Sequence, residues 1–174
     1  MGFGLGANPV EELLHELGRW GLKFLLLGLA ITPLRRISGW NWLLRFRRML
    51  GLFAFFYVLL HFLVYAVLDQ GLEIELIIED IIERPYITLG MTGLLLLIPL
   101  AATSTKAMMR KLGKRWQTLH RLVYVIAIAG VWHFYWQEKL ATLEATIYVL
   151  VLVLLLLVRI YYSRWFRRAL AQKI

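Results

Sequence analysis

Three histidines lie within or beside long apolar stretches of this 174-residue chain. His61 is part of RMLGLFAFFYVLLHFLVYAVL, and His120 and His133 are part of LGKRWQTLHRLVYVIAIAGVWHFYW. An ionisable side chain inside a membrane-spanning segment is costly, so it usually has a function. Because imidazole is a common axial ligand of haem iron, we treat these three histidines as candidate haem ligands.

The depths of the histidines favour His61 and His133 as a pair. His61 lies 13 residues after Arg48, whereas His133 and His120 lie 18 and 5 residues after Arg115. At ~1.5 Å of helical rise per residue, His61 lies roughly 20 Å from the level of Arg48, and His133 and His120 lie roughly 27 and 7 Å from the level of Arg115. His61 and His133 therefore differ in depth by about 7 Å, which helix tilt could close, whereas His61 and His120 differ by about 12 Å. Two axial imidazoles bind one iron at about 2 Å from opposite sides, so they must lie at nearly one level.

His120 is harder to pair. It lies 13 residues before His133, which is about 140° around an ideal helix. The residue 13 before His61 is Arg48, so the matching level of the other span offers no histidine. The alternative for an intramembrane histidine is a hydrogen bond between helices, and His15 lies in a polar segment where a surface position is expected.

The elements that must position these histidines are membrane-spanning helices. The chain is 60% hydrophobic, and its mean hydropathy of +0.67 exceeds that of an ordinary soluble domain. Several apolar runs approach the roughly 20 residues that a transmembrane helix needs. We expect an all-α, polytopic transmembrane helix bundle that forms one domain over residues 1–174. Its five spans are predicted at 20–34, 49–68, 87–102, 119–136 and 143–158.

Two polar segments are predicted to form surface helices. Met1–Glu16 is expected to contain a short helix that starts at Pro9, with Asn8 as its cap. The acidic segment LEIELIIEDIIERP has apolar residues at helical spacing, which predicts an amphipathic interfacial helix ending at Pro85. The alternative for this segment is a plain acidic connector. No internal repeat is evident.

The charges separate the two sides of the predicted bundle. Most of the 20 lysines and arginines lie in 35–48, in 103–121 and in the C-terminal tail. All 11 acids lie in the N-terminal segment, in 69–86 and in 137–144. The positive-inside rule then predicts a cytoplasmic C-terminus and an N-terminus on the outer side of the membrane. The net charge of +9 therefore reflects topology in a lipid bilayer and does not indicate nucleic-acid binding.

Several classes of chemistry are excluded by absent residues. The chain has no cysteine, which excludes disulfides, covalent haem attachment through CxxCH and iron–sulfur ligation by thiolate. It has no GxGxxG after a strand, no P-loop and no room for a Rossmann domain. Catalytic patterns such as paired carboxylates or Ser–His–Asp are also missing. We expect an electron-transfer subunit that performs no organic-substrate chemistry of its own.

The electrons must then come from another component, either a cytosolic flavin reductase or quinol in the membrane. Two alternatives stay open at this point. One is a non-redox membrane module in which the histidines form a proton relay or the chain anchors and assembles a partner. The other is a quinol-oxidising cytochrome of a different family.

Three stretches together resemble the ferric-reductase-like transmembrane family: RPYITLG, TSTKAMMRKLGKRWQTLHRLVY and HFYW. The similarity extends to GLGANPVEEL, LKFLLLGLAITPLRR and RRMLGLFAFFYVLLH, so it covers nearly the whole chain. Within that family, the chain resembles the haem-binding membrane subunits of bacterial periplasmic methionine sulfoxide reductase systems.

The resemblance implies b-type haem, with His61, His120 and His133 on the family's histidine positions. One haem is expected, or two if His120 is a ligand. The implied partner is a periplasmic molybdopterin-dependent subunit of the MsrP type, which reduces methionine sulfoxide in proteins. The family is also associated with FMN, although no residues here mark its site. Family members usually carry one further helix before the segment that matches GLGANPV, so we expect that helix to be absent from this chain.

Overall fold

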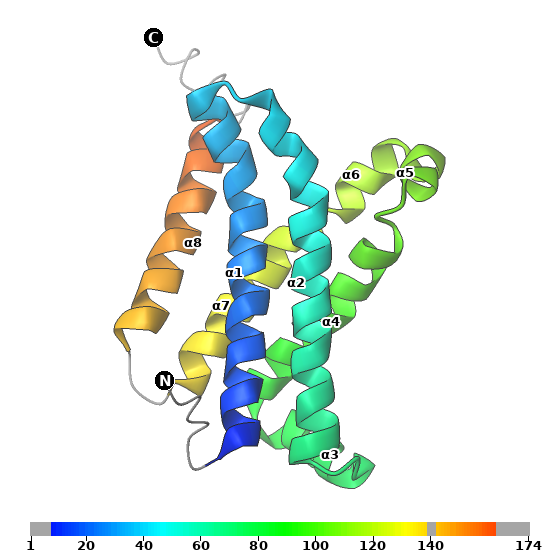
Figure 1. The fold of residues 1–174 in the computed structure, drawn as a ribbon, viewed down its shortest axis with the longest axis vertical. Helices are drawn as coiled ribbons and strands as arrows, with labels where there is room; N and C mark the ends of the chain where they lie inside the picture. The colour runs from blue at the N-terminus through cyan, green and yellow to red at the C-terminus, as the bar shows by residue number, and fades with distance from the viewer. Residues whose placement is uncertain (1–7, 139–141, 163–174) are drawn as a thin grey trace, which may run out of the picture.

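The computed structural model describes residues 8–138 and 142–162, which form a bundle of helices without strands (Figure 1). This confirms the predicted all-α transmembrane class. The helices are α1 Pro9–Ser38, α2 Leu44–Val64, α3 Ile74–Glu83, α4 Pro85–Ala102, α5 Lys106–Leu112, α6 Lys114–Leu119, α7 Leu122–Gln137 and α8 Leu143–Tyr161.

Helix α1 is longer than the sequence suggested. It begins as predicted, because Asn8 caps it by accepting a hydrogen bond from the backbone N–H of Glu11 at 3.3 Å, and Pro9 takes the first helical position. It then continues for 30 residues to Gly39, whose φ of 76° ends it. The separate surface helix expected near the N-terminus was therefore wrong. A single helical glycine such as Gly18 costs only about 1 kcal/mol, and packing along α2 offsets it.

Four helical segments in the described residues are long and apolar enough to cross a membrane: α1, the α2 region Asn41–Asp69, α4 and α8. Helix α7 corresponds to the remaining predicted span, but it has only 16 residues. It lies between α4 and α8 and contacts both. The predicted amphipathic helix is present as α3, and Pro85 follows it at the first position of α4.

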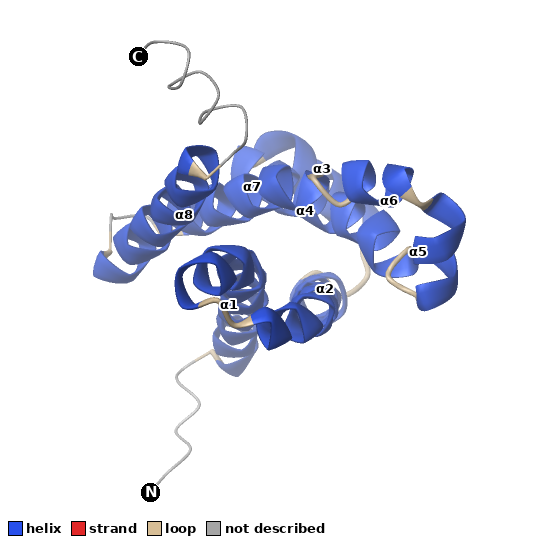
Figure 2. Cartoon of the chain, turned by 90° about the horizontal axis from the view of Figure 1, so that it is seen from above, coloured by secondary structure: helices blue, strands red, loops and turns tan. Residues whose placement is uncertain are grey.

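The helices form two layers, with α1 and α2 in one and α4, α7 and α8 in the other (Figure 2). Helix α1 packs along α2, and α4 packs along α7. Leucines 22, 25 and 29 of α1 are buried between the layers against Ile126 of α7. The Arg159 guanidinium of α8 donates to the Leu29 carbonyl at 2.7 Å and to the Tyr124 hydroxyl, which fixes α8 against α1 and α7.

The two ends of the bundle differ in what they contain. Helices α1 and α4 begin, and α2 and α7 finish, at the end that carries α3 (Figure 1). We call this the α3 end. The opposite end carries the basic helices α5 and α6, and we call it the α5 end.

Candidate functional site

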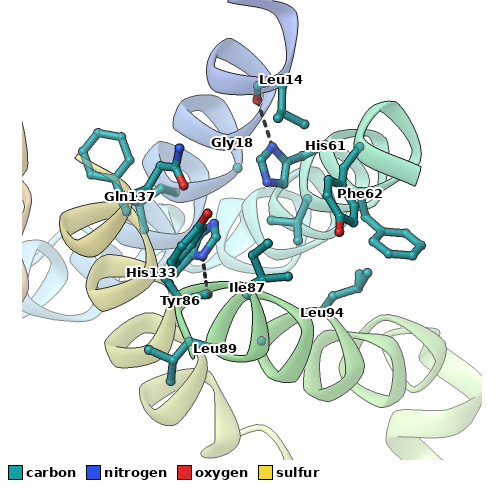
Figure 3. Close-up of a pocket in the computed structure, with 18 of the residues that line it drawn as sticks. Leu14, Gly18, His61, Phe62, Tyr86, Ile87, Leu89, Leu94, His133 and Gln137 are labelled. Atoms are coloured by element: carbon teal, nitrogen blue, oxygen red, sulfur yellow. Dashed lines mark hydrogen bonds between the residues drawn. The ribbon is translucent and has the colours of Figure 1, made fainter. Parts of the chain in front are cut away.

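A cavity of about 340 Å³ opens between α1, α2, α4 and α7 at the α3 end (Figure 3). Its volume is within the range of small-molecule and cofactor sites. The deep wall is apolar and includes Leu22, Leu25, Leu94, Leu97 and Ile126. The mouth is polar and includes Asn8, Glu11, His15, Arg19, Arg84 and Gln137. This arrangement suits a flat apolar ligand with polar groups at one edge.

Two histidines face each other across this cavity. His61 comes from the last turns of α2 and His133 from the last turns of α7. Their ring centroids are 6.1 Å apart, and the ring planes are inclined by 77°. Both rings point into the same space in Figure 3.

Each of the two rings is held through its Nδ1 atom. His61 Nδ1 lies 2.8 Å from the Leu14 carbonyl oxygen, and His133 Nδ1 lies 2.6 Å from the Tyr86 carbonyl oxygen. A carbonyl oxygen only accepts hydrogen bonds, so Nδ1 carries the proton in both rings. The Nε2 lone pairs are then directed into the cavity, which is the arrangement of a metal-ligating histidine.

A glycine lies behind each ring. A Cβ atom at Gly18 would lie 3.1 Å from Nδ1 of His61, and one at Gly90 would lie 3.0 Å from Cε1 of His133. Both distances are shorter than an ordinary van der Waals contact. Glycine at these two positions therefore lets each imidazole lie directly against the neighbouring helix, α1 or α4.

Of the other two histidines, His15 lines the cavity and His120 does not. His120 lies between α6 and α7 and is not part of the cavity lining. Its ring stacks on Trp116 with centroids 3.9 Å apart, and its Nδ1 is 3.1 Å from the Trp116 carbonyl oxygen. His15 lines the cavity mouth. Gly130 of α7 also lines the cavity.

The depth difference predicted between His61 and His133 is absent, because the two rings lie side by side. The prediction counted residues from Arg115 as though one helix ran through to His133. In the structure α6 ends at Leu119 and α7 begins only at Leu122 (Figure 1). Counting across that break overstated the depth of His133.

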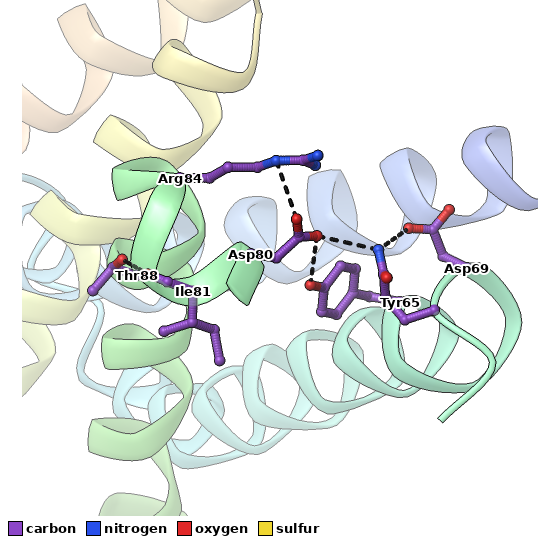
Figure 4. Close-up of polar contacts among 7 residues, drawn as sticks. Tyr65, Asp69, Asp80, Ile81, Arg84 and Thr88 are labelled. Carbon is purple, nitrogen blue, oxygen red and sulfur yellow. Dashed lines mark hydrogen bonds and ion pairs between the residues drawn. The ribbon is translucent and has the colours of Figure 1, made fainter. Parts of the chain in front are cut away.

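A buried carboxylate supports the cavity mouth (Figure 4). Asp80 of α3 accepts hydrogen bonds from the Tyr65 hydroxyl at 2.9 Å and from the Gln70 amide at 3.1 Å. It also pairs with Nε of Arg84 at 3.1 Å. The Asp80 carboxylate raises the pKa of Arg84, so this mouth residue stays cationic. The contacts join the end of α2 to α3 and to the start of α4.

The donor set fits haem better than a bare metal ion. Among the described residues, no group of three or more His, Cys, Asp or Glu side chains is placed to hold a metal. Haem iron needs only two axial ligands from the protein. A point midway between the rings lies about 3 Å from each ring centre, which equals a metal–imidazole bond of ~2 Å plus about 1 Å within the ring. His61 and His133 therefore fit the two axial positions.

Sequence reasoning missed the two glycines, although the sequence holds a signal for them. Residues 17–25 read LGRWGLKFL and residues 89–97 read LGMTGLLLL, so both share the pattern LGxxGLxxL. The pair HF likewise occurs at His61–Phe62 and at His133–Phe134. Both repeats have the same separation, since 89 − 17 and 133 − 61 are each 72. The statement that the chain has no internal repeat was therefore wrong.

Comparison with known proteins gives matches over most of the chain. The model of the ferric reductase like transmembrane component matches residues 17–131. Three relatives carry the name protein-methionine-sulfoxide reductase heme-binding subunit MsrQ. The relative from Herminiimonas arsenicoxydans is 49% identical and covers 95% of this chain and 77% of its own length. The one from Agrobacterium fabrum is 55% identical, with coverages of 88% and 71%.

The third relative, from Rhizobium meliloti, is 52% identical and covers 98% of this chain and 82% of its own length. No solved structure matches this chain significantly.

Proposed function

The chain belongs to the ferric-reductase-like transmembrane family, and on that basis we propose that it is the haem-binding membrane subunit of a methionine sulfoxide reductase system. The observation that carries this proposal is the pair of facing imidazoles of His61 and His133. Their ring centroids are 6.1 Å apart in a cavity of the size of a cofactor site. The names of the similar proteins support the same function.

The chain's own residues would hold and orient a b-type haem at the α3 end. Bound haem supplies one-electron chemistry. His61 and His133 would hold the haem iron through their Nε2 atoms, and the carbonyls of Leu14 and Tyr86 fix the ring orientations. The apolar deep wall excludes water, and Arg84 at the mouth offers a cationic partner for carboxylates. Two imidazole ligands from the protein would suit a haem that transfers electrons rather than one that binds a substrate at its iron.

The charge distribution supports one orientation of the chain in the membrane. We place the α5 end in the cytoplasm and the α3 end in the periplasm of a bacterial inner membrane, by the positive-inside rule. The chain then relays electrons to a periplasmic molybdopterin-dependent subunit that reduces methionine sulfoxide in proteins. The donor is a cytosolic flavin reductase or a membrane quinol.

A second cofactor, if present, belongs at the α5 end. Four side-chain atoms in the described residues are buried without a hydrogen-bond partner: Thr32 Oγ1, Arg35 Nε, His120 Nε2 and Arg159 Nε. All four belong to the half of the bundle nearer α5 and α6. A buried polar atom without a partner can mark the place of a bound group, and two of these atoms belong to arginines. A second haem would take His120 as its ligand, whereas the phosphate of FMN would be a partner for the arginines.

The proposal is tested with the purified full chain in detergent. Its visible spectrum should show a six-coordinate b-type haem that dithionite reduces. Reduced protein should be reoxidised on addition of the periplasmic subunit together with methionine sulfoxide, and by neither alone. A spectrum that lacks haem after haem-replete expression would support the non-redox membrane module instead. Reoxidation that a quinone analogue drives and the periplasmic subunit does not would support the cytochrome of another family.

A further inference from the structure

The cavity between the two helix pairs has an approximate internal two-fold symmetry, in which the residues around one histidine correspond to residues 72 positions later around the other. Three pairs around the histidines share this offset: Leu14 with Tyr86, Gly18 with Gly90, and His61 with His133. Each histidine thus has a backbone carbonyl partner and a glycine at equivalent positions of the two helix pairs. The α1–α2 pair and the α4–α7 pair are two versions of one structural unit.

The symmetry axis runs along the helices. Helices α1 and α4 both begin at the α3 end, and α2 and α7 both finish there, so the two pairs have the same orientation (Figure 1). A half turn that exchanges His61 with His133 must pass midway between the rings and perpendicular to the line that joins them. That line is the axial direction of a haem held by both rings. The symmetry axis therefore lies in the plane of the haem.

Haem b has a near-symmetry axis of its own. It passes through the meso carbon between the two propionates, and a half turn about it exchanges the faces of the ring. This turn leaves both propionates at the same edge and interchanges only methyl and vinyl positions. The cavity has a polar mouth at the α3 end and an apolar deep wall, so the propionates belong at the mouth. The two axes then coincide.

The deep wall distinguishes the two faces of the haem at Ile126, whose counterpart Ala54 on α2 is not part of the cavity lining, and at one pair in which both residues line it. Leu22 and Leu25 on α1 correspond to Leu94 and Leu97 on α4, and all four line the cavity. Val58 on α2, by contrast, corresponds to Gly130 on α7, and both line the cavity.

The neighbouring glycines report the same difference in space. A Cβ atom at Gly21 would lie 2.7 Å from Cγ2 of Val58, whereas one at its counterpart Gly93 would have nothing within 4 Å.

We propose that the cavity binds haem b in both orientations related by this half turn, and that the difference between Val58 and Gly130 contributes to their ratio. This rests on the proposed haem binding. Because the histidines and the leucines of the deep wall match across the axis, the two populations should lie within about tenfold of each other, or about 1.4 kcal/mol. His61 and His133 ligate the iron in both orientations, but each faces the opposite side of the porphyrin.

The orientations are counted by proton NMR of the oxidised full chain in detergent, because the haem methyl signals of ferric low-spin haem shift outside the protein envelope. Two sets of methyl signals are expected. An analogue with methyl groups in place of both vinyls should give one set. A single set from haem b, or two sets from the analogue, would overturn the proposal. Failure to bind haem would instead overturn the proposed function.

A symmetrised variant tests the two residues. Val58→Ala combined with Gly130→Ala places the same side chain on both faces, and the ratio should move toward 1:1. A Cβ atom at Gly130 meets Leu22 at 3.6 Å, an ordinary contact, so the variant should fold. Gly51→Ala, where nothing lies within 4 Å of the new Cβ atom, is the control and should keep the wild-type ratio. An unchanged ratio in the double variant would overturn the role given to Val58 and Gly130.

Discussion

At the scale of single residues, each of the two histidines proposed as haem ligands belongs to a three-residue unit. The unit comprises the histidine, a backbone carbonyl that accepts from its Nδ1, and a glycine that leaves room for the ring. The carbonyl and the glycine lie four residues apart on one helix, so they face the same side of it. The histidine comes from the other helix of the pair. Ring orientation is therefore fixed by backbone atoms rather than by a second side chain.

We predict that Gly90→Ala weakens haem binding about 10–100-fold, the usual effect of disturbing the groups that orient a metal ligand. The new methyl group would lie 3.0 Å from the His133 ring, which the Tyr86 carbonyl holds in place. Gly18→Ala should act in the same way on His61. Haem affinity is measured by titrating haemin into the apoprotein in detergent. Gly51→Ala on α2 is the matched control, and an equal affinity in Gly90→Ala and Gly51→Ala would contradict the prediction.

At the scale of helices, Asp80 connects three elements around the cavity mouth. Its carboxylate is buried, and it bonds Tyr65 of the π-helical turn Tyr65–Asp69 and Arg84 before α4. The turn at Gly71 and Leu72, with φ of 60° and 63°, reverses the chain so that α3 returns to α2. The acidic segment thus shapes the site, and it does not only connect two spans.

We predict that Asp80→Asn destabilises the protein by about 1–3 kcal/mol, because the ion pair with Arg84 is lost and a buried acceptor becomes a partly unsatisfied amide. The thermal midpoint of the haem band in detergent should fall by several degrees. Glu79→Gln makes the same chemical change at the exposed neighbouring residue and should leave the midpoint unchanged. Equal midpoints in both variants would show that Asp80 does not stabilise the mouth.

Much of this helical arrangement could be predicted from the sequence. Apolar runs indicated the spans, and Asn8, Pro9 and Pro85 indicated helix starts that the structure contains. The break near His120 could not be predicted, because no glycine or proline marks it between the end of α6 at Leu119 and the start of α7 at Leu122. The approach of each glycine to a histidine 43 residues away also depends on helix packing, which no local pattern encodes.

At the scale of the whole molecule, the two ends carry opposite charge. Exposed basic residues on α5 and α6 include Arg110, Lys111, Lys114 and Arg115. Exposed glutamates lie on α3 at positions 75, 79 and 83. Opposite potentials of this kind steer charged partners to different ends of one protein. An acidic donor is suited to the α5 end, and an acceptor with a basic patch is suited to the α3 end.

Reversing the charges of Arg110, Lys111, Lys114 and Arg115 should slow reduction of the haem by a cytosolic flavin reductase about tenfold or more at low salt. The difference should shrink as ionic strength rises, because salt screens the interaction. Stopped-flow reduction across a salt series measures it. Reversal of Glu75 and Glu79 is the control, since it should slow only the reaction with the periplasmic partner. Rates that do not depend on ionic strength would remove the steering account.

Low-temperature EPR of the oxidised full chain tests most directly whether His61 and His133 hold the haem. Their ring planes are inclined by 77°, and near-perpendicular axial imidazoles give a strongly anisotropic low-spin ferric signal. We predict this signal in the wild-type chain and in His120→Ala. It should be lost in His61→Ala and in His133→Ala, with high-spin ferric haem or no haem in its place. Survival of the signal in either of those two variants, or its loss in His120→Ala alone, would contradict the account.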